Sequence, residues 1–92
     1  MRFYRDNLTT AGLVERVLNM TGMTQQQLGD VIGVRQSTIS RWQEGGKMTE
    51  IAARLMDAIY VVQWTDERRA RILEEVETGR FSSALAIAMG RE

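Results

Sequence analysis

The chain has 92 residues, 43% of them hydrophobic and 26% charged, and it lacks proline, a composition that indicates a single folded, mostly helical domain. It has no run of 18 apolar residues, and its first ten residues, MRFYRDNLTT, hold no apolar segment of signal-peptide length, so we expect a cytoplasmic protein without a membrane partner. The chain has no cysteine, which excludes disulfides and thiolate metal sites, and no histidine, which removes the commonest general base. Its formal net charge is zero.

Apolar residues recur with helical spacing through almost the whole chain, and the first helix is predicted at residues 10–20, ended by Gly22. One face of this helix carries its apolar residues, Leu13, Val14, Val17 and Leu18. No strand is convincing, since residues 1–5 are too short a stretch to assign as one.

The second helix is predicted to begin at Thr24, because Thr24 and Gln27 have the spacing of a capping box, and to stop at Gly33. Its buried face is expected to comprise Leu28, Val31 and Ile32. A short third helix is expected at 36–43, before a double glycine at 45–46 breaks the chain.

Threonine residues at helix-capping positions predict the next two helices. Thr49 precedes a fourth helix at 50–62, which is apolar on several sides, and Thr65 precedes a fifth that Gly79 ends.

The last helix is expected to be short, capped by Ser82, running to Met89 and closed by Gly90. Its apolar stripe is expected to comprise Phe81, Leu85 and Ala88. Because helices four and six carry more apolar surface than a small monomer can easily hide, we expect a homodimer or higher oligomer built from residues after about 50. The alternative is a compact six-helix monomer.

Residues 24–45 form the most informative segment, with QQQLGDVIGVRQSTISRWQE at 25–44. Gly29 and Gly33 stand among apolar residues at fixed spacing, and I-S-R-W at 39–42 is followed, after Gln43, by E-G-G at 44–46. These apolar residues are Leu28, Ile32, Val34, Ile39 and Trp42. In these features the segment resembles the helix-turn-helix of lambda-type phage repressors and Cro-like, XRE-type regulators. The resemblance implies two helices packed at a steep angle, with Gly29 as the small residue at their contact and Gly33 at positive φ in the turn.

The resemblance also implies an all-α, five- to six-helix lambda-repressor-like domain, with a DNA-binding part at 1–62. From its apolar surface, the C-terminal helical extension of the same domain, residues 63–92, is expected to serve oligomerisation. The expected function is that of a transcriptional regulator that binds double-stranded DNA. A dimer would read an inverted-repeat operator, with the helix at 36–43 of each subunit in a major groove. A repressor is favoured over an activator, although the sequence itself leaves both open.

Removing the core positions from the third helix leaves a surface without an acidic residue, formed by Arg35, Gln36, Ser37, Thr38, Ser40 and Arg41. A merely solvated helix face usually mixes charges of both signs, so this composition favours DNA contact over two helices that only pack together. Arginine can pair with guanine and glutamine with adenine, each through two hydrogen bonds. The residues expected to face base edges or adjacent phosphates are Arg35, Gln36, Ser37, Ser40 and Arg41.

Arg35 departs from the family pattern, which usually has serine or threonine at this N-cap. Arginine is a poor cap, and its charge opposes the positive end of the helix dipole. We therefore hypothesise that Arg35 serves DNA contact, with a tolerated surface arginine as the alternative.

The resemblance assigns phosphate contacts to the start of the first motif helix, where Thr24 and Gln25 stand in this chain. Lys47, the only lysine, is a candidate for a second phosphate contact. The arm at residues 2–5, RFYR, is interpreted as core or dimer packing ahead of DNA contact, because two aromatic residues separate its arginines.

The net charge of zero is unusual for a nucleic-acid-binding protein, but residues 1–47 carry six basic and four acidic side chains, whereas residues 48–92 carry six and eight. Two alternatives stay open: an antitoxin that represses its own operon and binds a toxin, and a protein-interaction module that has lost DNA binding. A polymerase is a further conceivable protein partner. Glu74 and Glu77 show no base partner for catalysis, so we expect no enzyme activity, cofactor or metal.

Overall fold

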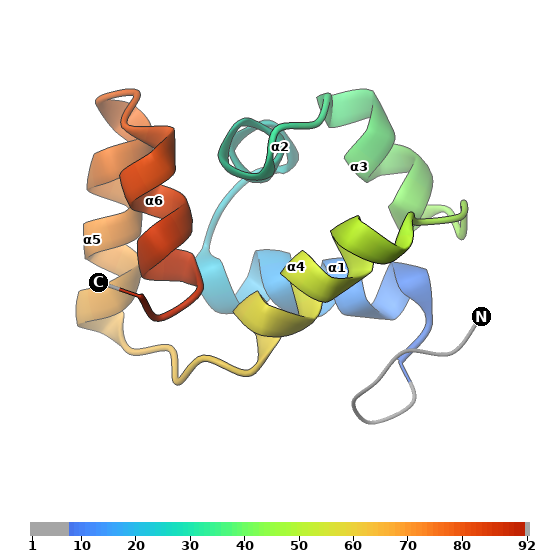
Figure 1. The fold of residues 1–92 in the computed structure, drawn as a ribbon, viewed down its shortest axis with the longest axis horizontal. Coiled ribbons are helices and arrows are strands. Elements are labelled where there is room, and N and C mark those ends of the chain that lie inside the picture. The colour runs from blue at the N-terminus through green and yellow to red at the C-terminus, as the bar shows by residue number, and fades with distance from the viewer. Residues whose placement is uncertain (1–7, 92) are drawn as a thin grey trace.

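The computed structural model describes residues 8–91 and contains, within that range, six helices and no strand (Figure 1). The helices are α1 (Thr10–Thr21), α2 (Gln25–Ile32), α3 (Gln36–Gln43), α4 (Glu50–Tyr60), α5 (Asp66–Glu77) and α6 (Phe81–Ala88). The predicted all-α fold is confirmed, whereas residues 1–5 and the arm at 2–5 lie outside the described residues. Within residues 8–91, no helix has the length and hydropathy of a membrane-spanning segment.

A threonine hydroxyl caps the N-terminus of four of these helices. Thr9, Thr24, Thr49 and Thr65 each accept a hydrogen bond from the backbone N–H three residues further on, at 3.1–3.2 Å. Each such bond satisfies one N–H that has no partner inside the helix, and a cap of this kind stabilises a helix by about 1 kcal/mol. The caps predicted at Thr24, Thr49 and Thr65 are confirmed.

Helix α4 ends two residues earlier than predicted, at Tyr60 instead of residue 62. The indole Nε1 of Trp64 donates to the carbonyl oxygen of Ile59 at 3.0 Å. In a longer helix this carbonyl would accept from the backbone N–H of residue 63. The Trp64 side chain therefore takes the place of the next helical hydrogen bond and starts the loop to α5.

Helix α6 corrects the predicted cap at Ser82, because the helix begins at Phe81 and its N-cap is Arg80. The backbone N–H of Arg80 donates to the carbonyl oxygen of Glu75 at 2.8 Å, and its Nε donates to the Glu75 carboxylate at 2.7 Å. These bonds hold residue 80 against the end of α5, so α6 starts immediately after it and Ser82 lies exposed in the first turn.

The apolar stripe predicted for α6 is also partly wrong. The residues of α6 that are buried are Ala84, Ile87 and Ala88. Phe81 is 36% exposed and Leu85 is half-buried. The stripe fails because α6 packs against both α5 and α2, so the face that points into the core is set by two neighbours and not by the spacing of the largest side chains.

One hydrophobic core joins all six helices. Helix α1 packs against α3 and α4, and α2 packs against α3, as Figure 1 shows. The large side chains at the centre, with at most 1% of their surface exposed, are Leu13, Val14, Val17, Leu28, Ile39, Met56, Ile59 and Ile72. The predicted core faces of α1 and α2 are therefore largely confirmed, with Leu18 and Ile32 half-buried at their edges.

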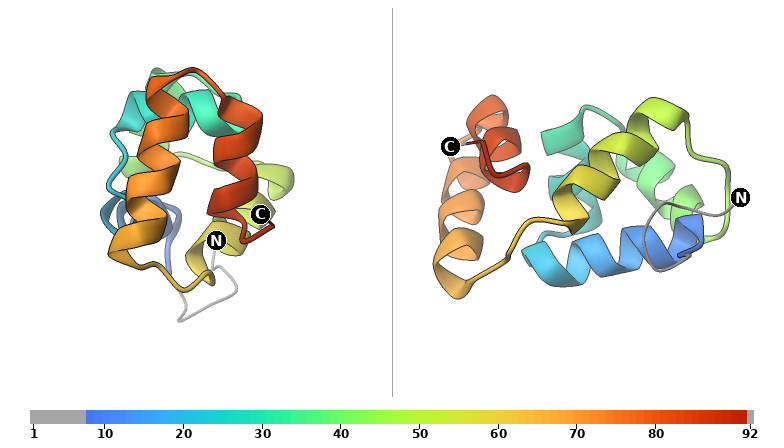
Figure 2. Two further views of the ribbon diagram at one scale, coloured as in Figure 1. Left: turned by 90° about the vertical axis from the view of Figure 1, so that its left-hand side faces the viewer. Right: turned by 60° about the horizontal axis from the view of Figure 1, so that its bottom comes forward.

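Helices α5 and α6 form a hairpin at one end of the molecule (Figure 2), and both pack against α2. The guanidinium of Arg69 donates to the carbonyl oxygen of Met20, near the end of α1, at 3.3 Å. The guanidinium of Arg68 donates to the carbonyl oxygen of Ile87 in α6 at 2.9 Å. The Arg69 bond links the hairpin to the first helix, and the Arg68 bond links the two helices of the hairpin to each other. The oligomerisation role expected for residues 63–92 stays a prediction.

Candidate nucleic-acid interface

Helices α2 and α3 meet at Gly29, where a side chain has no room. A Cβ atom at Gly29 would lie 2.5 Å from the carbonyl oxygen of Val34. The turn follows at Gly33, which has φ 87° and donates its N–H to the carbonyl oxygen of Gly29 at 2.7 Å. Both glycines have the roles that the sequence predicts, the first for close approach and the second for positive φ.

The predicted core positions of this pair of helices mostly point inward. Leu28, Ile39 and Trp42 are buried, while Ile32 and Val34 are half-buried and pack against the core. These residues fix one face of α3 against α1 and α2, so the opposite face is directed away from the molecule.

The outward face of α3 holds the residues predicted to contact DNA. Arg35, Gln36, Ser37 and Arg41 are exposed, and Ser40 is half-buried. No acidic side chain occurs among residues 35–43. The structure therefore brings the five predicted residues of this helix together on one polar surface that carries two cations and a glutamine.

Arg35 is the N-cap of α3 and makes no side-chain cap hydrogen bond. Arg35 stands at the N-terminus of the helix, the positive end of the helix dipole, where a cation is disfavoured. The helix thus begins without the capping bond that threonine gives to α1, α2, α4 and α5.

The start of α2 keeps groups suited to an anion. Thr24 and Gln27 form the complete capping box, with the Thr24 N–H donating to Gln27 Oε1 at 2.9 Å. The Thr24 hydroxyl accepts from the backbone in this box, so its own hydrogen is left to donate outward. The backbone N–H groups of Gln25 and residue 26 lie in the first turn, where a helix offers them no carbonyl partner.

A side chain that waits for a phosphate would point into solvent, but the Gln25 side chain is bonded to two other side chains. Its Oε1 accepts from Gln36 Nε2 at 3.2 Å, and its Nε2 donates to Gln43 Oε1. Gln43 Nε2 in turn donates to Glu15 Oε2 on α1 at 3.4 Å. Sequence reasoning missed Glu15 and Gln43, since they lie 28 residues apart and no local pattern links them.

The loop after α3 folds back tightly on the end of that helix. Gly45 has φ 94°, and the N–H of Gly46 donates to the carbonyl oxygen of Arg41 at 2.8 Å. A Cβ atom at Gly46 would lie 2.9 Å from the same oxygen. The double glycine therefore brings Lys47 beside the end of α3.

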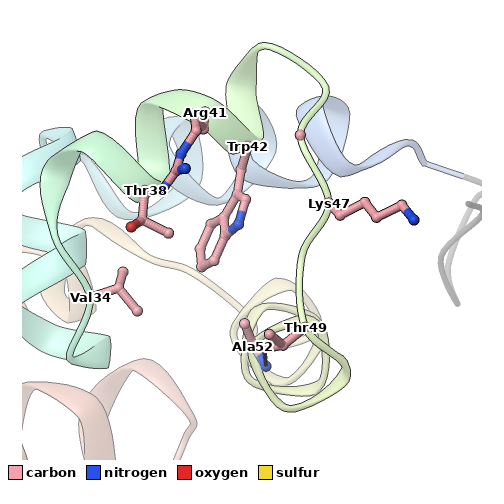
Figure 3. Close-up of a pocket in the computed structure, with 8 residues that line it drawn as sticks. Val34, Thr38, Arg41, Trp42, Lys47, Thr49 and Ala52 are labelled. Carbon is pink, nitrogen blue, oxygen red and sulfur yellow. Dashed lines mark hydrogen bonds between the residues drawn. The ribbon is translucent and has the colours of Figure 1, made fainter.

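A pocket of about 320 Å³ opens between α3, this loop and the start of α4 (Figure 3). Arg41 and Lys47 bring two exposed cations to it, and Thr38 and Thr49 bring hydroxyl groups. Its apolar wall is formed by Val34, Trp42 and Ala52. In Figure 3 the Lys47 side chain extends away from the Trp42 ring, so its ammonium group lies at the rim.

The outward face of α3, the start of α2 and the loop after α3 thus present cations, hydroxyls, amides and backbone N–H groups that have no helical partner. A protein-family model described as "Helix-turn-helix" matches residues 14–59, which is half of the chain and contains α2, α3 and the loop that carries Lys47. No curated protein and no solved structure matches the chain.

Proposed function

Since the chain belongs to the lambda-repressor-like helix-turn-helix family of DNA-binding regulators, we propose that it is a cytoplasmic transcriptional repressor that recognises an inverted-repeat operator in double-stranded DNA. The observation that carries this proposal is the outward face of α3, which exposes Arg35, Gln36, Ser37 and Arg41 and includes no acidic residue. A helix with this surface fits the major groove, where sequence can be read from base edges.

In this proposal the N-terminal half of α3 reads bases. Gln36 stands in the first turn, where its amide can accept from N6 and donate to N7 of adenine, and Arg35 can pair with guanine. Ser37 and Ser40 are short, which lets the helix approach the groove closely, and their hydroxyls can bond to bases or phosphates.

Two anchors position α3 against the DNA backbone. The first is the start of α2, where the Thr24 hydroxyl and the backbone N–H of Gln25 would bind one phosphate. The second is the pocket beside α3, where Arg41 and Lys47 would bind another. Phosphate contacts of this kind fix register and supply affinity that does not depend on sequence.

We propose that two subunits bind the operator together as a homodimer. Most of the apolar surface on which the expected oligomer rested is buried within the monomer, notably Met56 and Ile59 of α4 and Ile87 of α6. The large apolar side chains that stay exposed in residues 8–91 are Ile51, Val61 and Phe81. Three separated side chains make a small interface, so association is expected to be weak in free solution and to be completed on DNA.

The test is selection of duplexes from a random-sequence pool at physiological salt, followed by sequencing. The wild-type chain is expected to enrich an inverted repeat whose half-sites lie about one helical turn, roughly 34 Å, apart. The variant R35A/R41A is expected to enrich nothing, whereas R54A/R91A, which removes two exposed arginines outside the motif, is expected to enrich the same repeat. Absence of enrichment by wild type would overturn the proposal in favour of a protein-interaction module.

A further inference from the structure

A chain of side-chain hydrogen bonds connects α1 to the first residue of α3. Gln43 Nε2 donates to Glu15 Oε2 at 3.4 Å, Gln25 Nε2 donates to Gln43 Oε1, and Gln36 Nε2 donates to Gln25 Oε1 at 3.2 Å. Three helices thus contribute four side chains to one network, which we call the amide relay. It ends at the glutamine that the proposed function places against a base.

The direction of this relay is fixed by its first member. A carboxylate can only accept hydrogen bonds, so Gln43 must present its NH₂ group to Glu15 and its oxygen to Gln25. Gln25 must then present its NH₂ group to Gln43 and its oxygen to Gln36. Each amide is thereby held in one of the two orientations that differ by exchange of oxygen and nitrogen.

Gln36 is consequently left with a defined set of free groups. One N–H of its Nε2 is taken by Gln25, while its other N–H and its whole Oε1 stay available. Adenine offers one donor and one acceptor in the major groove, whereas guanine offers two acceptors. An amide held in this orientation suits adenine, but an amide that turns over can direct its NH₂ group at guanine.

We propose that Glu15 and Gln43 are positioning residues that hold the Gln36 amide in one orientation and so determine the preference for adenine at the operator base that Gln36 faces. This inference rests on the proposed function, because it requires that α3 reads base edges. Glu15 acts through Gln43 and Gln25 and needs no DNA contact of its own. Its role therefore lies in selectivity and not in affinity.

The variant E15Q isolates this role, because a glutamine is nearly the same size but can donate as well as accept, which removes the fixed direction. The matched control is D30N, which also neutralises one exposed acid of the motif region but lies outside the relay. Both variants gain the same charge, so an effect of net charge on DNA binding appears equally in the two.

Selection from the random pool is run with wild type, E15Q, D30N and Q36A, and the position that loses its preference in Q36A identifies the base that Gln36 faces. At that position alone, E15Q is expected to lower the adenine-to-guanine ratio by at least about threefold. This is part of the discrimination against the wrong base that a contact with two hydrogen bonds supplies. D30N is expected to keep the wild-type ratio. An unchanged ratio in E15Q, with a clear wild-type operator, overturns the relay and leaves the proposed function standing; no wild-type operator overturns both.

A second readout needs no DNA. In ¹⁵N-resolved spectra of the free protein, the side-chain NH₂ signals of Gln43, Gln25 and Gln36 are expected to move in E15Q and to stay in place in D30N. Movement that reaches Gln36 supports the relay, because a purely local role of Glu15 would move Gln43 at most. Gln36 signals that do not move would contradict it.

Discussion

Gly29 lies where α2 contacts the turn before α3, and its lack of a side chain allows the backbone of that turn to come close. The turn that leads into α3 passes so close to α2 that a Cβ atom here would lie 2.5 Å from the carbonyl oxygen of Val34. The obstacle is backbone, which cannot turn aside as a long side chain can. The angle between α2 and α3, and with it the outward face of α3, depends on this one residue.

The variant G29A is therefore expected to lose about 1–3 kcal/mol of stability, the usual cost of overfilling a packed site. An ordinary helical glycine behaves oppositely, since alanine there stabilises by roughly 0.5–1 kcal/mol. Urea unfolding measures the difference. The comparison variant G33A meets no atom within 4 Å and should lose only the cost of positive φ, about 1 kcal/mol. A G29A protein as stable as wild type would refute the close approach.

Helices α3 and α6 both begin with an arginine N-cap that makes no side-chain capping bond. Arg35 makes no capping bond, whereas a threonine hydroxyl caps α1, α2, α4 and α5. Because Arg35 lacks a capping bond and is exposed beside Gln36, the proposed function gives it a role in DNA contact and not in helix stability.

The variant R35S should raise the free energy of unfolding by about 1 kcal/mol, because serine supplies the missing cap and removes a cation from the helix N-terminus. It should also weaken binding to the selected operator. Thermal unfolding and fluorescence anisotropy with a labelled duplex measure the two effects on the same sample. Higher stability together with unchanged operator affinity would mean that Arg35 is only a tolerated surface residue.

Sequence patterns predict the elements well where one local feature decides them. The capping box at Thr24 and Gln27 and the turn at Gly33 are of this kind, and all three have the expected roles. The predictions for the end of α4 and the start of α6 were wrong. Trp64 ends α4 through its bond to Ile59, and Arg80 sets the start of α6 through its bond to Glu75, and neither bond leaves a local signal in the sequence.

Some residues of the candidate site could likewise be predicted from the sequence, and others could not. The outward residues of α3 follow from helical periodicity once the core positions are known, and they were predicted from it. The amide relay could not be, because Glu15 and Gln43 come together only when α1 packs against α3. Side-chain pairs between helices depend on the tertiary packing and leave no periodic signal.

For the whole molecule, a net charge of zero limits attraction to DNA to the side that carries the cations. Arg41 and Lys47 stand on that side, around the pocket next to α3. Binding is expected to depend on a few phosphate contacts, so the logarithm of the affinity should fall with the logarithm of the salt concentration with a slope set by that small number.

The variant K47A tests whether the cations beside α3 contact phosphates. It should weaken binding to operator and to unrelated duplexes by a similar factor, and it should reduce the slope of log K against log salt by about 1 for each bound subunit, as expected when each subunit loses one phosphate contact. Titrations at several salt concentrations measure both quantities. A loss confined to the operator, with an unchanged slope, would place Lys47 against a base instead of a phosphate.

In the proposed complex the outward face of α3 lies in the major groove, while the α5–α6 hairpin stays clear of the DNA. The most direct test is titration of the selected duplex into ¹⁵N-labelled protein, followed through the backbone amide signals. The largest changes are expected at residues 24–27, 35–41 and 46–47, with little change along α5 and α6. Largest changes on α5 and α6, with α3 unaffected, would contradict the proposed complex.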